Sequence, residues 1–229
     1  MLKQKDTVVL SQRIEKEREF FKIETRMEDI TKTLTDTHHR KDIWYVLGEV
    51  TFCTHVGTHI EAPYHHVKDG MDVADLPTHK LIGNCVVLDF CIKKDKEKIT
   101  LEEIKKHDAL IHEGDLVFIM TGMDKYYGTS RWMEMPYLAA EANLWLINKK
   151  IGCLGMDSAG LEIPGTDNQP NHTELFKAQI PQIESLTNLD KIENGKYIVI
   201  VLPLPIKGLD ASPLRVVAIR KEALINALQ

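Results

Sequence analysis

The sequence lacks the features that would place the chain in a membrane, on nucleic acid or outside the cell. Its longest purely apolar runs, such as Val199–Leu202, are far shorter than the roughly 20 residues of a membrane span. Residues 1–30 mix acidic and basic side chains without an apolar segment that leads to a cleavage site, so a cytoplasmic location is expected. The net charge of -5 leaves no basic excess for phosphate backbones, which argues against nucleic acid as a partner.

Cysteine is scarce, and its spacing excludes two common kinds of site. The four cysteines form no Cys-x-x-Cys pair, so neither a zinc knuckle nor a redox motif is indicated. We expect buried free thiols, because a free cysteine behaves as a small hydrophobic residue. The sequence also has no Gly-x-Ser-x-Gly elbow, which argues against a serine hydrolase.

What the chain does contain is enough apolar sequence, 43% of 229 residues, to bury a substantial core. Short apolar segments predict strands at Asn84–Phe90, Asp115–Thr121, Ile151–Met156, Lys196–Leu202 and Arg215–Arg220. Helices are predicted after the capping-box pattern at Thr100 and from Pro136 onward. Because helices and strands are interspersed, the sequence predicts one α/β domain over residues 1–229 with a mixed sheet.

Three further segments flank the residues that carry chemistry. Ser11–Ile30 is dense in alternating charges and predicts an exposed or partly packed helix. Trp44–His55 is rich in aromatic and β-branched residues and predicts a strand that runs into a histidine-rich segment. Asp157–His172 has a turn-forming composition and predicts one long loop, and loops of that length are often functional.

The histidine-rich segment, residues 55–66, is the clearest candidate for a metal site. It places four possible ligands or catalytic groups at odd positions: His55, His59, Glu61 and His65. In an extended chain these side chains point to one side, but His55 and His59 would lie roughly 13 Å apart. The chain must therefore turn, and Gly57 and Pro63 permit the bends. Two imidazoles and a carboxylate form a recognised ligand set for a catalytic zinc ion.

Other residues near this pattern receive ordinary interpretations. We expect packed or surface roles for the remaining isolated histidines: His38, His39, His79, His107 and His112. His66 has the opposite parity and is not assigned. Cys53 has the right parity to approach the site, but a thiolate ligand there is the less favoured interpretation. Arg215 is expected to hold a loop rather than to pair with an acidic substrate.

The segment resembles the signature His-x-Gly-Thr-His-x-Asp-x-Pro-x-His of the cyclase-like metal-dependent hydrolases, which include bacterial kynurenine formamidase and isatin hydrolase. The matching residues are His55, Gly57, Thr58, His59, Pro63 and His65. Glu61 stands where the family usually has aspartate, and its extra methylene is expected to shift the position or preference of the metal. The resemblance continues through residues 69–77, 81–83, 121–122, 151–157, 183–188, 202–205 and 212–215.

The resemblance implies a swivelling β/β/α fold and a homodimer or homotetramer. It also implies two metal ligands beyond the motif, His172 and Glu184, and makes His65 the catalytic histidine. Residues 1–43 show neither the Asp-Leu-Ser strand nor the Trp-x-Gly-Asp turn that usually walls the substrate pocket of a kynurenine formamidase. The aryl-formamide substrate is therefore left open, whereas the metal site is unaffected.

Together these features predict a metal-dependent, arylformamidase-like hydrolase that cleaves a C–N bond of a small amide or lactam. One or two divalent ions, zinc first and manganese second, would lower the pKa of a bound water towards about 7. His65 would serve as general base and then as general acid. Two alternatives stay open: a non-catalytic metal-binding module, and a lactam or ester hydrolase or cyclase of the same family with a different substrate.

Overall fold

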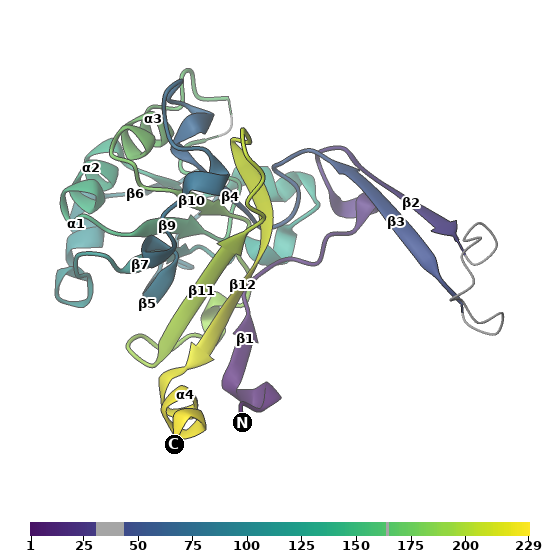
Figure 1. The fold of residues 1–229 in the computed structure, drawn as a ribbon. Helices are drawn as coiled ribbons and strands as arrows, with labels where there is room; N and C mark the ends of the chain where they lie inside the picture. The colour runs from purple at the N-terminus through teal and green to yellow at the C-terminus, as the bar shows by residue number, and fades with distance from the viewer. Residues whose placement is uncertain (31–43, 164) are drawn as a thin grey trace.

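The computed structural model describes residues 1–30, 44–163 and 165–229, and its centre is an eight-stranded mixed sheet (Figure 1). The strand order is β1 (Thr7–Val9), β12 (Ala211–Arg220), β11 (Tyr197–Pro203), β5 (Ile82–Asp89), β7 (Leu116–Met120), β9 (Cys153–Met156), β10 (Gln182–Glu184) and β4 (His59–Glu61). The strands β5, β7, β9 and β10 are parallel, and the other pairings are antiparallel. Because the first part of β12 also pairs with β4, the sheet closes into a barrel-like ring.

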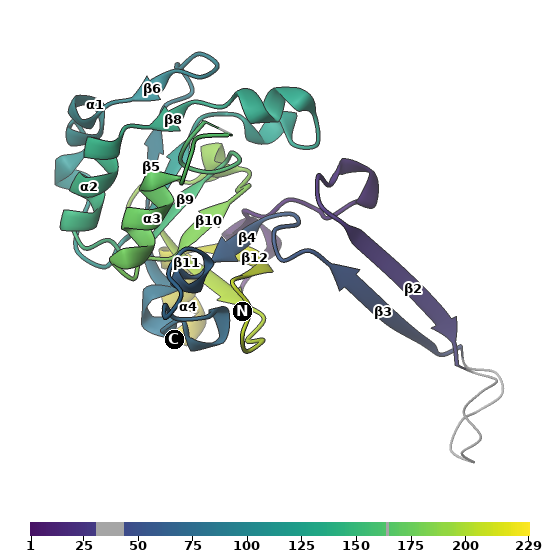
Figure 2. The same ribbon diagram turned by 90° about the horizontal axis from the view of Figure 1, so that it is seen from above.

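Helices cover one side of this ring. The helices of the described residues are α1 (Leu101–Lys105), α2 (Ala140–Asn148), α3 (Pro170–Lys177) and α4 (Lys221–Leu228). Helices α1, α2 and α3 lie together on the face of β5, β7 and β9, whereas α4 follows β12 near the start of the chain (Figures 1 and 2). None of the helices within the described residues has the length and apolar character that a membrane span requires.

Successive side chains of the central strands pack into two separate cores. On β7, Leu116 and Phe118 belong to the core inside the ring, whereas Val117 and Ile119 belong to the core beneath the helices. This alternation follows from the two-residue period of a strand. Strands β7 and β9 are buried on both faces, which explains their continuous apolar sequence. All five predicted strands are confirmed, with ends shifted by a few residues.

A two-stranded ribbon projects away from the ring (Figures 1 and 2). It pairs β2 (Ile23–Asp29) with β3 (Val46–Phe52) in antiparallel register. The predicted helix over Ser11–Ile30 is therefore wrong, because pairing with β3 supplies the hydrogen bonds that an isolated charged helix would have made internally. The predicted strand over Trp44–His55 is confirmed for β3, but it ends before the histidines.

The helix predicted from Pro136 begins later than expected. Residues Tyr137–Leu138 form β8, which pairs with β6 (Lys98–Ile99), and α2 starts only at Ala140. The fixed φ of proline suits an extended segment as well as a first helical turn, so the residue alone did not decide between them. The helix predicted at Thr100 is confirmed, with its capping box formed by Thr100 and Glu103.

The segment predicted as one long loop ends in a helix. Pro170 occupies the first turn of α3, where its missing N–H has no intrahelical role. His172 consequently lies within α3 and is buried, rather than at the end of a solvated loop. This correction matters for the site, because a helix holds an imidazole in a more defined direction than a loop does.

Candidate metal centre

The histidine segment turns where the sequence predicted a turn. Gly57 adopts a φ of +63°, in the left-handed region that favours glycine. A Cβ at this position would also lie 2.6 Å from Ile14 Cγ1, so close packing excludes a side chain there as well. After the turn the chain enters β4, where His59 and Glu61 are both buried and share one face of the strand.

Closure of the ring brings the distant residues to β4. Strand β10 pairs with β4 so that Glu184 lies directly opposite His59. On the other edge of β4, Ala211 lies opposite Glu61, which places the loop before β12 beside the site. His172 arrives from the first part of α3. Residues more than 100 positions apart in the sequence are therefore neighbours at this one strand.

Five predicted ligands converge in two overlapping groups. His55 Nε2 and His59 Nε2 lie 3.2 and 3.7 Å from Glu61 Oε1. His172 Nε2 lies 3.8 Å from Glu61 Oε2 and 3.3 Å from Glu184 Oε1. Glu61 thus offers one carboxylate oxygen to each group, and the ligand atoms within each group all lie within 4.8 Å of one another.

The imidazoles are oriented by neighbours on their far side. His59 Nδ1 lies 3.0 Å from the carbonyl oxygen of Gly57, and His172 Nδ1 contacts the buried carboxylate of Glu162. In both rings Nδ1–H is the donor, which leaves Nε2, the nitrogen available to a metal, directed at the carboxylates. Metal-ligating histidines are typically held in this way by a second hydrogen bond.

The electrostatics of the centre favour a bound cation. Burial alone would lower the pKa of His55 and His59, yet the adjacent Glu61 raises both above the usual value. Burial likewise opposes ionisation of Glu61, but its close contacts with the imidazoles of His55 and His59 hold its pKa well below the usual range. Burial also lowers the pKa of His172, but the hydrogen bond with the carboxylate of Glu162 is the main contribution that outweighs it and raises this pKa to about 10. These carboxylates retain protons on the imidazoles, and a divalent ion would replace those protons.

The donor atoms fit a metal ion. Among the buried side-chain atoms of the described residues that make no hydrogen bond, three belong to the proposed ligands: His55 Nε2, His59 Nε2 and Glu61 Oε2. Each unsatisfied buried polar group costs about 1–3 kcal/mol, so a cluster of three at one point indicates a missing partner. One or two divalent cations at this point would satisfy all of them. Mixed imidazole and carboxylate ligands suit zinc and manganese alike.

The structure brings every residue of the predicted site to one place, whereas their individual roles stay predictions. His65 lies in the 3-10 turn Pro63–His65, with Nε2 3.9 Å from Glu61 Oε1. Cys53 belongs to none of the ligand groups formed by the described residues, and Arg215 is exposed on β12. His38 and His39 lie outside the described residues.

Sequence reasoning missed two carboxylates that contact the site histidines. Glu162 binds His172, and the Oδ2 atom of Asp210 lies 2.9 Å from His65 Nδ1. The hydrogen bond from His65 is the main cause that lowers the pKa of Asp210 to about 2. Neither acidic residue lies in the histidine motif, and only the fold reveals their partners. A weak signal existed for Asp210, because it lies two residues before Ser212, where one of the stretches that carry the family resemblance begins.

A cavity of about 340 Å³ opens onto the centre. Its outer wall is aromatic: Phe20, Phe21, Tyr127 and Trp132. Phe20 stacks on Trp132 with ring centroids 5.4 Å apart and the planes 13° from parallel. Both phenylalanines precede β2, so the base of the projecting ribbon forms part of the wall, although the Trp-x-Gly-Asp turn is absent. Among the described residues that line the cavity, there is no lysine or arginine.

Comparison with known proteins agrees with this geometry. Residues 8–163 match the model of the Cyclase family. The kynurenine formamidase of Geobacillus thermodenitrificans is 31% identical over 176 residues, which cover 76% of this chain and 80% of that protein. The kynurenine formamidase of Bacillus cytotoxicus is 28% identical over 172 residues, with coverages of 75% and 78%.

Solved structures confirm the predicted α/β fold with its mixed sheet. An isatin hydrolase bound to the product analogue thioisatinate superposes with a TM-score of 0.79 at 22% identity, covering 94% of this chain and 93% of that chain. A structure described as a potential metal-dependent hydrolase with cyclase activity gives 0.74 at 26% identity, with coverages of 94% and 98%. With its matching family model, its relatives and its fold, the chain belongs to the Cyclase family.

Proposed function

We propose that the chain is a metal-dependent hydrolase that cleaves the C–N bond of a small amide or lactam. The observation that carries this proposal is the set of three unpartnered, buried ligand atoms at the inner end of a cavity that also contains His65. The names of its relatives, kynurenine formamidase and isatin hydrolase, support the same reaction class.

His55, His59 and Glu61 would hold one ion, and Glu61, His172 and Glu184 would hold a second. Zinc is the preferred ion and manganese the next, because both accept this mixture of nitrogen and oxygen ligands. When bound, such an ion polarises a carbonyl group and lowers the pKa of a coordinated water towards about 7. Glu61 would be shared between the two positions, since its two oxygens face different histidines.

We assign the proton transfers of the proposed reaction to His65, which lies beside the ligands. Its ring lines the cavity and is partly exposed, whereas His59 and His172 are buried. In the proposed reaction, His65 Nε2 takes a proton from the attacking water and later delivers it to the leaving nitrogen. Removal of a general acid–base of this kind lowers turnover by about 10²–10⁴-fold.

The lining of the cavity favours a flat, uncharged substrate. Its aromatic wall provides stacking surfaces for a ring, and aromatic pairs of this kind contribute roughly 0.5–1.5 kcal/mol beyond their buried area. A substrate carboxylate would find no lysine or arginine among the described residues that line the cavity. We therefore propose that a neutral aryl amide or lactam is preferred over an amino-acid substrate such as N-formylkynurenine.

The test combines metal content with hydrolysis. Mass spectrometry should find one or two equivalents of zinc or manganese in the purified chain, and His59→Ala should lose the equivalent that the group of His55, His59 and Glu61 holds. The unaltered chain should open the isatin ring faster than it deformylates N-formylkynurenine. A metal-free native protein would contradict the proposal, and normal metal content without hydrolysis of any amide, lactam or ester would favour the non-catalytic metal-binding module.

We also propose that the chain acts as a homodimer or homotetramer in the cytoplasm. Large apolar side chains are exposed along the β2–β3 ribbon, among them Met27, Leu47 and Val50. An isolated two-stranded ribbon is marginally stable in water, and exposed apolar surface often marks an interface. Light scattering coupled to size-exclusion chromatography should give at least twice the mass of one chain, and a monomer would contradict this assembly.

A further inference from the structure

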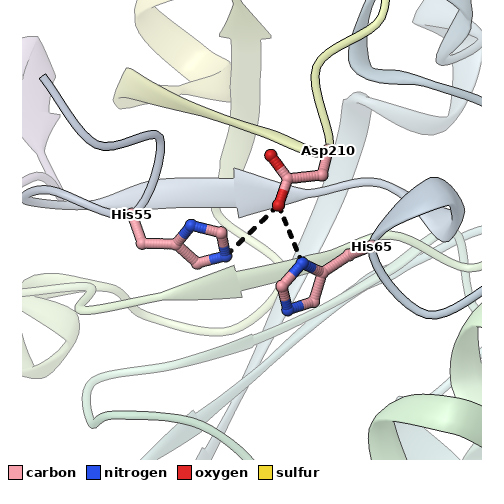
Figure 3. A group of neighbouring side chains, drawn as sticks. All are labelled: His55, His65 and Asp210. Carbon is pink, nitrogen blue, oxygen red and sulfur yellow. Dashed lines mark hydrogen bonds and ion pairs between the residues drawn. The ribbon is translucent and has the colours of Figure 1, made fainter.

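A carboxylate outside the metal-ligand groups proposed above lies directly behind the proposed base (Figure 3). Asp210 Oδ2 is 2.9 Å from His65 Nδ1, and the same oxygen is 3.9 Å from His55 Nε2. The other oxygen, Oδ1, accepts a hydrogen bond of 3.1 Å from Thr54 Oγ1. The carbonyl oxygen of Asp210 accepts a further bond of 2.8 Å from the amide of Ala62. Backbone and side chain together therefore fix this carboxylate relative to the segment that carries His65.

This contact decides which nitrogen of His65 is free. A carboxylate can only accept, so His65 Nδ1 must carry the hydrogen that joins it to Asp210. The lone pair is then on Nε2, which lies on the side of Glu61 and the cavity. Without an acceptor at Nδ1 the ring could adopt the other tautomer, in which Nε2 carries the hydrogen and cannot accept a proton.

Asp210, His65 and His55 could also be viewed as a third group of metal ligands, since their ligand atoms lie within 4.8 Å of one another. Two observations favour hydrogen bonding instead. His55 Nε2 is nearer to Glu61 Oε1, at 3.2 Å, than to Asp210, at 3.9 Å. In addition, the buried ligand atoms without partners belong to His55, His59 and Glu61, whereas His65 Nδ1 and Asp210 already satisfy each other.

We propose that Asp210 is a positioning residue for His65. It accepts the Nδ1 hydrogen, keeps Nε2 free to take a proton from the attacking water, and stabilises the resulting imidazolium until Nε2 passes that proton to the leaving nitrogen. Asp210 remains ionised throughout, as the aspartate of a Ser-His-Asp triad does. The role in turnover rests on the proposed function, but the tautomer of His65 does not.

The first experiment needs no substrate. Two-dimensional ¹⁵N–¹H spectra of the zinc-loaded chain, with His65 assigned by comparison with His65→Gln, report which ring nitrogen carries the hydrogen. We expect the Nδ1–H form in the unaltered chain and a shift towards the Nε2–H form in Asp210→Asn. An unchanged His65 tautomer in the variant would overturn the proposal, whether or not an activity has been found.

The second experiment measures isatin ring opening together with zinc content. Asp210→Asn should lower kcat by about 10²-fold or more, with KM and zinc content close to those of the unaltered chain. Asp210→Glu, which keeps the charge, should recover part of the loss. A loss of zinc in Asp210→Asn would make Asp210 a metal ligand and would overturn its positioning role.

The matched control is Asp72→Asn. Asp72 Oδ2 accepts a 2.6 Å hydrogen bond from the amide of Gly208, so it anchors the same loop without contacting an imidazole. We expect this variant to keep kcat and the His65 tautomer. An equal loss in Asp72→Asn would show that the loop as a whole matters, and would overturn the specific role of Asp210. If the unaltered chain hydrolyses neither isatin nor N-formylkynurenine, the proposed function fails, while the spectra still decide whether Asp210 sets the tautomer of His65.

Discussion

Each buried histidine of the metal centre has one ring nitrogen held by a neighbour and the other directed at a carboxylate. For His59 the neighbour is a backbone carbonyl, which no side-chain substitution removes. For His172 it is the side chain of Glu162, which also accepts from the backbone N–H of His172. A side-chain substitution can therefore disturb the orientation of His172 but not that of His59. The residue concerned, Glu162, lies outside the histidine motif.

Glu162→Ala should weaken metal binding without removing a ligand. Loss of the carboxylate frees His172 to rotate and to change tautomer, and such partners typically contribute 10–100-fold in metal affinity. Titration of zinc against a chromogenic chelator would measure the change. Glu174→Ala is the control, because Glu174 is exposed on the same helix and its ion pair is with Lys177. Equal zinc affinity in the unaltered chain and in Glu162→Ala would contradict this assignment.

Because the two oxygens of Glu61 face different ligand groups, we expect different metal contents in two carboxylate variants. Glu61→Gln removes a ligand from both groups, so both equivalents of metal should be lost. Glu184→Gln removes a ligand only from the group that contains His172, so about one equivalent should remain. Mass spectrometry of each purified variant would count the ions. Complete loss of metal from Glu184→Gln would instead indicate a single ion that all the ligands share.

At the scale of single elements, α1 shows how a short segment becomes a helix. Helices of five residues are marginal in isolation, because nucleation is costly. Here Thr100 Oγ1 accepts from the amide of Glu103, and the Glu103 carboxylate accepts from the amide of Thr100. Lys93 Nζ lies 2.7 Å from the same carboxylate, and Ile104 is fully buried beneath the helix. The cap and the packing therefore stabilise a helix that is too short to be stable by itself.

This cap should make part of the stability depend on pH. The hydrogen bond from Lys93 is the main cause that lowers the pKa of Glu103 to about 2, from a usual value near 4.5. A carboxylate whose pKa is lower in the folded state than in the unfolded state stabilises the fold at pH values above the unfolded-state pKa. This contribution is lost as pH falls from about 4.5 to about 2. Because the carboxylate is partly exposed, we expect only about 1 kcal/mol. Urea unfolding should show Glu103→Gln less stable at pH 7 but nearly equal to the unaltered chain at pH 2; a constant difference would contradict this.

At the scale of the whole molecule, the closed ring is what assembles the ligands. His59 on β4 and Glu184 on β10 meet because their strands pair, and His172 joins them from helix α3. The unfolded chain has no such assembly, so metal should bind the folded state far more tightly. Ligands that bind only the folded state stabilise it by mass action.

Chelation should therefore lower the thermal stability of the whole molecule. At a free zinc concentration 100 times Kd, binding adds about 2.7 kcal/mol to the free energy of unfolding. Scanning calorimetry with zinc and with EDTA should show a clear drop in Tm for the unaltered chain. Glu61→Gln should give the same Tm in both conditions, because it removes a ligand from both groups. Identical curves for the unaltered chain with and without EDTA would contradict a metal-stabilised fold.

The sequence alone determined the features that depend on nearby residues. The apolar runs predicted the central strands, since burial on both faces leaves no polar positions in them. Parity placed His59 and Glu61 on one face of a strand, and Gly57 marked the turn that His55 needed. These inferences held because side-chain period and backbone freedom are local properties of the chain.

The tertiary structure alone decided the features that depend on pairing between distant segments. The charged segment before residue 30 became a strand because β3 was available to pair with it, whereas its own composition favoured a helix. Glu162 and Asp210 gained their importance only from the histidines that they contact, 10 and 145 positions away. Contacts between distant segments leave no periodic pattern in a single sequence, so strand register and ring closure had to come from the fold.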